Sequence, residues 1–258
     1  MAIRNVPLFI FATFPVFARY LTPQLQRLTM LIQKKTNIQK HILIAGILFG
    51  ICIIATMEAH WFISKKGFGF GESGGAKFAA DFYIKNQIKG PTFNNFDIGS
   101  YFEYRLYPKQ KTFVDGRPEA FPAKFFTEAY IPMQQHPKAF EDVDNLFHFN
   151  SIFFAHTDQT PWAEQFIQSI VHNDQWKIVY LDDTVIILVR NNKANKKLID
   201  NNPIDETTVD FDPPEESNKL FSYAHFFATA GWVKQTKISY EAILQKDPYH
   251  CPVLYNMG

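Results

Sequence analysis

HILIAGILFGICIIATMEAHW, residues 41–61, is the longest apolar run in the chain, and residues 42–57 contain no charged side chain. A helix of about 20 apolar residues can cross the roughly 30 Å hydrocarbon core of a bilayer. The run therefore predicts a transmembrane helix. A buried helix of a soluble domain is one alternative. A signal peptide is another, although no clear small-x-small cleavage site follows the run.

The segments before this run extend the membrane prediction. Residues 19–40 carry a basic cluster, which favours the cytoplasmic side and sends the chain after residue 61 outward: Arg19, Arg27, Lys34, Lys35 and Lys40. Residues 6–17 are apolar but contain Pro7 and Pro15, so they fit a bent span, an interfacial helix or the stub of a longer span. Residues 1–62 are thus predicted to form a helical hairpin in the inner (plasma) membrane, with the lipid bilayer as a partner.

Composition narrows the possible functions. The chain has 26 Lys and Arg against 25 Asp and Glu, a formal net charge of +1, so it lacks the basic surface that nucleic-acid binding requires. Cys52 and Cys251 fall in separate predicted parts and do not make a disulfide framework. The glycines of residues 63–75 predict a flexible connector rather than a phosphate-binding loop.

Residues 76–190 alternate between helical and strand patterns. The expected order is helix 76–89, strand 92–96, helix 97–106, strand 111–114, an interrupted helix 121–140, strand 151–155, helix 161–172, and a hairpin of strands 176–180 and 185–190. This alternation predicts a small, three-layer-like α/β extracytoplasmic domain whose sheet is largely parallel, with the hairpin at one edge.

The C-terminal quarter has two parts. Residues 191–216 are rich in Asn, Asp, Glu, Lys and Pro and predict a polar linker. Residues 217–258 carry apolar and small side chains at the spacing of a tetratricopeptide (TPR) helix pair: Leu220, Tyr223, Ala224, Phe227, Gly231, Thr236, Tyr240, Ile243 and Pro248. The pattern restarts and is truncated at residue 258, so we expect a fragment of a longer chain. A single helical hairpin that closes the α/β domain is the alternative.

Five stretches together resemble the C-terminal region of bacterial polytopic membrane proteins of the glycosyltransferase C type. They are RNVPLF (4–9), FNNFDIGSY (93–101), LYP (106–108), FVDGRPEAF (113–121) and WKIVY (176–180). The resemblance covers about residues 1–190. It implies a transferase that takes sugar from a lipid-linked donor, with TPR repeats after its α/β domain.

The resemblance also sets limits on activity. Such enzymes place catalytic acids in an early extracytoplasmic loop, and no such region is present in this sequence. We therefore expect a membrane-anchored accessory domain that does not catalyse alone, uses no cofactor, and contacts a lipid-linked sugar or glycan. A TPR scaffold that binds a protein partner and a small complete enzyme are the alternatives.

Polar residues at the predicted ends of strands form the candidate ligand site: Asn94, Asn95, Asp97, Tyr101, Asp115 and Arg117. Ligands of open α/β sheets bind beyond the carboxyl ends of the strands. The same residue types also cap helices, form turns and make ion pairs, so a structural role is the competing interpretation. The histidines lack the spacing of a zinc site, and we predict no metal.

Overall fold

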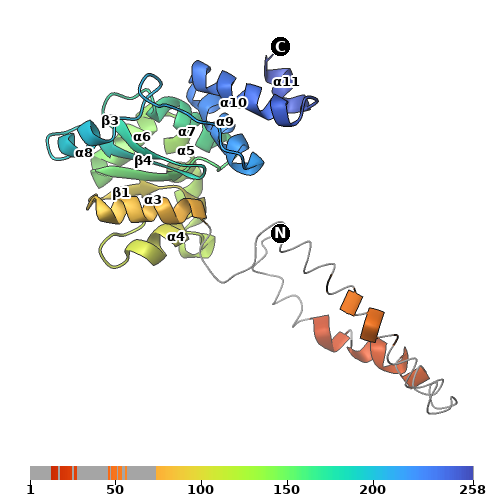
Figure 1. Ribbon diagram of the computed structural model, residues 1–258. Coiled ribbons are helices and arrows are strands. Elements are labelled where there is room, and N and C mark those ends of the chain that lie inside the picture. Colours follow the sequence, from red (N-terminus) through yellow and green to blue (C-terminus); the bar gives the residue numbers. More distant parts are fainter. Residues whose placement is uncertain are drawn as a thin grey trace. The chain divides into compact units, whose positions relative to one another are not determined.

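The computed structural model describes residues 13–16, 18–24, 26–27, 46, 48–50, 52–53, 56 and 74–257. The chain divides into two compact units, Met1–Gly71 and Glu72–Gly258. Figure 1 traces the elements of the second unit.

The prediction of membrane-spanning helices is wrong for the described residues. Among them, no helix has the length and apolar character needed to cross a membrane. Most of segments 6–17 and 41–61 lies outside the described residues. The described residues therefore contradict the predicted transmembrane hairpin over 1–62 and the inner-membrane location.

Four strands make the sheet of the second unit: β1 (Thr92–Asn94), β2 (Ser151–Ala155), β3 (Trp176–Leu181) and β4 (Val185–Arg190). Their order is β1-β2-β4-β3; β1 and β2 are parallel, whereas β4 runs antiparallel to both neighbours. The prediction of a largely parallel sheet is therefore wrong. The hairpin places β4 beside β2, so the sheet contains one parallel pair, β1 with β2.

Two helices cover one face of the sheet, α3 (Gly74–Lys85) and α4 (Phe96–Leu106) (Figure 1). The sequence of β4 explains why both faces are covered. It reads VIILVR, so alternate side chains on either face are apolar. Val185, Ile187 and Val189 pack with α3 and α4, and Ile186 and Leu188 enter the cluster on the opposite face.

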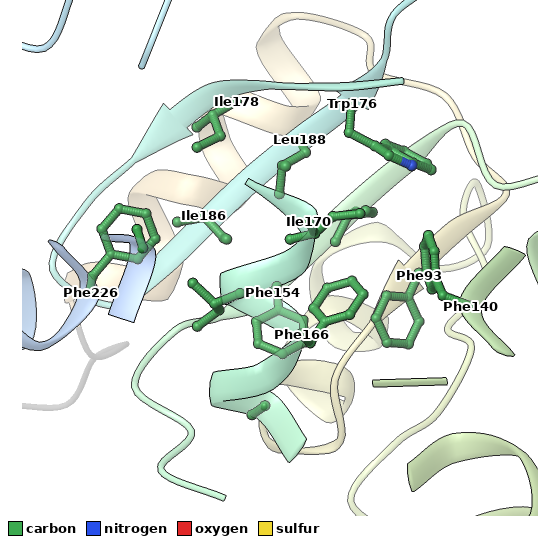
Figure 2. Packing of buried hydrophobic residues seen from close by; sticks show 14 of the residues in the cluster. Phe93, Phe140, Phe154, Phe166, Ile170, Trp176, Ile178, Ile186, Leu188 and Phe226 are labelled. Carbon is green, nitrogen blue, oxygen red and sulfur yellow. The ribbon is translucent and has the colours of Figure 1, made fainter. Parts of the chain in front are cut away.

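The second face carries η3 (Phe125–Tyr130), α5 (Ile131–Gln135), α6 (Pro137–Phe147) and α7 (Pro161–Ile170). Pro132 and Pro137 stand at the first turns of α5 and α6, where a proline leaves no additional donor unsatisfied. The core here is aromatic: Figure 2 shows Phe93, Phe140 and Phe166 gathered beneath the sheet. The ring of Phe93 lies 5.2 Å from Phe166 and 5.8 Å from Phe140, and both pairs meet edge to face. The high phenylalanine content thus serves the core.

Residues 111–114 do not form the predicted strand. The side chain of Asn94 binds this segment instead: Nδ2 donates to the carbonyl of Val114 at 2.6 Å, and Oδ1 accepts from the amide of Phe113 at 2.8 Å. Gly99 allows the close approach, since an added Cβ would lie 2.0 Å from the Val114 oxygen. The side chain of Asn94 therefore makes the backbone hydrogen bonds that a neighbouring strand would otherwise make.

The predicted linker, residues 191–216, contains helix α8 (Lys196–Asn201) and packs on the domain. Ile204 forms an isolated bridge with Ile178 of β3. Phe211 packs edge to face on Phe227, with ring centroids 4.8 Å apart. A few apolar residues are enough to hold this polar segment in place.

The C-terminal helices are α9 (Ser217–Ala230), α10 (Val233–Lys246) and α11 (Cys251–Met257). Gly231 ends α9 with a left-handed φ of 74°, which suits a residue without Cβ. Phe226 and Phe227 of α9 enter the core of the α/β unit, whereas Leu220 and Ala224 pack in the cluster that includes Val253 of α11. The helix pair thus closes the domain on one side and stacks on a third helix on the other.

Candidate functional site

A pocket of about 230 Å³ opens beyond the carboxyl ends of β1 and β2. These strands are the parallel pair, so the loops that follow them meet at one edge of the sheet. Aromatic and aliphatic side chains make up most of its lining: Phe96, Asp97, Pro118, Phe126, Tyr130, Ile131, Asp158, Thr160 and Trp162.

A π-helical turn, η3, builds one wall of the pocket. Such turns are rare and frequently lie at functional sites. They rotate side chains away from ordinary helical spacing, and here Phe126 meets Phe96 edge to face at 6.0 Å. The hydroxyl of Tyr130 accepts a 2.7 Å hydrogen bond from the amide of Phe96, and burial raises the pKa of this phenol. The wall is therefore fixed to the start of α4.

The start of helix α7 forms another wall of the pocket. The hydroxyl of Thr160 caps this helix by accepting from the amide of Ala163 at 3.4 Å, and Pro161 occupies its first turn. Trp162 follows, half-buried, and rests on the aromatic core while lining the pocket. A Thr-Pro-Trp sequence thus aims an indole ring at the site.

Two carboxylates stand in this apolar pocket. Asp158 is 4% exposed, and its oxygens accept from the side-chain amide of Asn95 and from the backbone amide of Thr160, both at 3.0 Å. Asp97 lies in the first turn of α4 and opens to solvent. Reduced hydration raises the pKa of Asp97, and the negative charge of Asp158 raises it further.

Asn94 and Asn95 are fully buried and support the site rather than line it. Asn95 accepts from the amide of Ala155 at 2.9 Å and donates to the carbonyl of the same residue at 3.2 Å, which extends the pairing of β1 with β2. Asn94 holds residues 113–114, as described above. Of the six residues that the sequence singles out, Asp97 alone is a lining residue.

Asp115 and Arg117 form an ion pair outside the pocket lining. Nη2 of Arg117 lies 2.5 Å from Oδ2 of Asp115 and 3.3 Å from Oε2 of Glu103. The guanidinium hydrogen bond lowers the pKa of Asp115 and raises that of Arg117. Pro118, the next residue, lines the pocket. The pair therefore anchors one rim of the pocket.

Tyr101 also lies outside the pocket lining. Its hydroxyl accepts a 2.8 Å hydrogen bond from Arg105, whose other nitrogen pairs with Asp81 of α3 at 2.5 Å. Tyr101 thus belongs to the contact between α3 and α4.

The sequence did not identify Asp158, Thr160 and Trp162 as site residues. It also did not identify the aromatic side chains of η3 that line the pocket. A signal for the first three exists, because they follow β2 just as Asn95 and Asp97 follow β1. The wall gave no such signal, since a π-helical turn has no sequence period of its own. Within residues 74–257 and the described part of the first unit, no group of three His, Cys, Asp or Glu side chains is arranged to hold a metal ion.

The fold and pocket define an α/β domain with a ligand-sized cavity at its parallel strand pair. No model of a known protein family, no curated protein and no solved structure matches the chain.

Proposed function

We propose that the 74–257 unit is a non-catalytic accessory module that binds a sugar unit of a glycan for a glycosyltransferase-like protein. The observation that carries the proposal is the pocket in which the ring of Trp162 and the carboxylates of Asp97 and Asp158 line the same small cavity. Its volume of about 230 Å³ lies below the roughly 300–1,000 Å³ of sites for drug-sized ligands, which suits one ring-sized unit.

The chemistry of the lining favours a sugar over other small ligands. An aromatic face packs on the C–H face of a pyranose ring, and a carboxylate oxygen accepts hydrogen bonds from its hydroxyls. Asp97 is the exposed acceptor, whereas both oxygens of Asp158 already have protein donors. Asp97 would thus contact hydroxyls directly.

The charge of the lining disfavours a phosphate head group. No Lys or Arg is among the lining residues, and two carboxylates would repel an anion. Arg117, the basic residue nearest in sequence to the lining residue Pro118, pairs with Asp115 and Glu103. We therefore propose that the module contacts the sugar part of a lipid-linked donor or glycan.

Titration of the isotope-labelled full chain with methyl glycosides, followed by NMR, tests the proposal. We expect millimolar binding that shifts the indole signal of Trp162, is lost in Trp162→Ala, and persists in Tyr104→Ala, which removes an exposed ring of α4. The proposal would be overturned if the parent protein bound none of the sugars, or if Trp162→Ala bound them as tightly as the parent. Release of free sugar on incubation with glycans would contradict the non-catalytic role.

Protein binding through the TPR-like helices is the second candidate. It is favoured by one observation: α11 packs on α9 and α10 while Tyr249 and Tyr255 are 85% and 87% exposed. A photo-crosslinker at position 255 should join one defined partner that a crosslinker at position 104 does not. Crosslinks of equal pattern from both positions would remove this candidate.

A further inference from the structure

Among the residues that the structure describes, the two carboxylates of the pocket have no counter-ion. In the described part of the chain, neither Asp97 nor Asp158 belongs to a salt bridge, whereas Asp115 is paired with Arg117. The donors to Asp158, the amide of Asn95 and the backbone of Thr160, are neutral. Neutral donors and the N-terminal ends of α4 and α7 stabilise the two carboxylates, but no cationic side chain among the described residues pairs with them.

The groups packed around the carboxylates do not neutralise them. Tyr130 contributes a phenol whose pKa both carboxylates raise further. On α7, Glu164 adds a negative charge and lies 3.6 Å from His225 of α9. The guanidinium of Arg117 is bound by two other carboxylates. The balance of charge around the pocket is therefore negative.

Aromatic rings line the same pocket. The rings of Phe96, Phe126 and Trp162 stand around the cavity that Asp97 enters. A cation over an aromatic face is attracted by the ring electrons, most strongly when the cation is partly desolvated. An ammonium group would be attracted by charge to a carboxylate and to a ring face at once, whereas a neutral hydroxyl gains only a hydrogen bond and an anion is repelled.

We infer that the sugar bound in this pocket carries a protonated amino group, held by Asp97 and Asp158 against the ring of Trp162. The inference rests on the proposed function and narrows its substrate class to amino sugars. Asp97 supplies the direct ion pair, because it is the exposed carboxylate. Asp158 supplies a buried charge whose position Asn95 fixes.

Competitive titration of the full chain at pH 6.5 tests the inference, with methyl glucosaminide, methyl glucoside and methyl N-acetylglucosaminide as probes. We expect the free amine to bind at least about tenfold more tightly than the other two, a difference of about 1.4 kcal/mol. Raising NaCl from 50 to 300 mM should reduce this ratio, since salt screens the exposed pair. Asp97→Asn should bring the ratio close to one, whereas the exposed control Asp210→Asn should keep it.

The outcomes separate the inference from the function beneath it. Equal affinity for the three probes would overturn the amino-sugar inference and leave sugar binding intact. A preference that survives Asp97→Asn would overturn the assignment of this pocket to the amine. Absence of binding by all three probes would overturn both proposals.

Discussion

The side-chain amide of Asn95 donates a 3.0 Å hydrogen bond to Oδ2 of Asp158 and so joins the loop after β1 to the loop after β2. The same amide group also bonds to the backbone of Ala155 through both of its polar atoms. Because Asn95 has no exposed surface, these bonds have no replacement from solvent. The geometry of the pocket thus depends on a residue that does not line it.

Asn95→Asp should lower the free energy of unfolding at pH 7 by about 3 kcal/mol, because a buried carboxylate would face the carbonyl of Ala155 and the charge of Asp158. The loss should shrink at pH 4, where the new carboxyl group can bind a proton and donate again. Urea denaturation at both pH values measures this. Asn218→Asp, an exposed position on α9, is the matched control, and equal losses in both variants would contradict the prediction.

Gly99→Ala should destabilise the protein by about 2–3 kcal/mol. Its Cβ would lie 2.0 Å from the backbone oxygen of Val114, and this clash exceeds the roughly 1 kcal/mol that alanine gains over glycine inside a helix. Gly116→Ala is the matched control, because its Cβ would meet the movable hydroxyl of Ser100 at 2.8 Å. Thermal unfolding should separate the variants by more than 5 °C; overlapping curves would show that residues 113–114 can yield.

Phe226→Ala should cost about 3–5 kcal/mol, the range for removing a large core ring. Phe226 is fully buried, and its centroid lies 5.1 Å from His156 and 5.5 Å from Trp232. A single unfolding transition is expected, since α9 shares the core of the α/β unit. Phe221→Ala, at a position 37% exposed, should cost about 1 kcal/mol or less. Two separate transitions in the parent protein would contradict the shared core.

His156 should make the protein sensitive to acid. Its ring is fully buried, and burial lowers its pKa to about 4 from an ordinary value near 6.5. The unfolded chain therefore binds the proton first, so stability conferred by neutral His156 falls as the pH drops from about 6.5 to about 4. The full difference corresponds to about 3 kcal/mol.

Urea denaturation between pH 7.5 and 4 checks this expectation. His156→Gln should show a shallower decline than the parent, because glutamine does not titrate in this pH range. Its amide can still donate to the carbonyl of Asp182, which lies 2.8 Å from Nε2 of the parent histidine. His136→Gln, on a turn outside the core, serves as the control and should follow the parent. Parallel profiles for the parent and His156→Gln would refute the role of this ring.

Local patterns predicted the elements that local chemistry determines. The apolar SIFFA run gave β2 with its observed bounds, and Thr160 with Pro161 marked the start of α7. Strand order was less accessible, because the sequence of VIILVR indicates burial on both faces but not which neighbour lies beside it. The pattern of residues 111–114 predicts a strand. In the structure the side chain of Asn94, 20 residues from Val114 in sequence, binds the backbone of this segment instead.

The apolar run of residues 41–61 led to the largest error. Hydropathy measures the composition of a segment, and among the described residues no helix is long and apolar enough to cross a membrane. Of the six site residues that the sequence singles out, Asp97 alone lines the pocket. Residues after β1 drew attention through Asn and Asp, whereas nothing in the sequence around Trp162 and Phe126 indicated a ligand site, and only the fold places both at one cavity.

The segments at the two borders of the sheet have a consequence for solubility. β1 and β3 are the outer strands, and unpaired backbone groups on such strands invite strand addition from other molecules. Residues 113–114, bound through Asn94, cover the end of β1, and Ile204 bridges to Ile178 on β3. These irregular segments should therefore hinder strand addition at the two edges. Variants that detach either segment from the sheet should polymerise before they unfold.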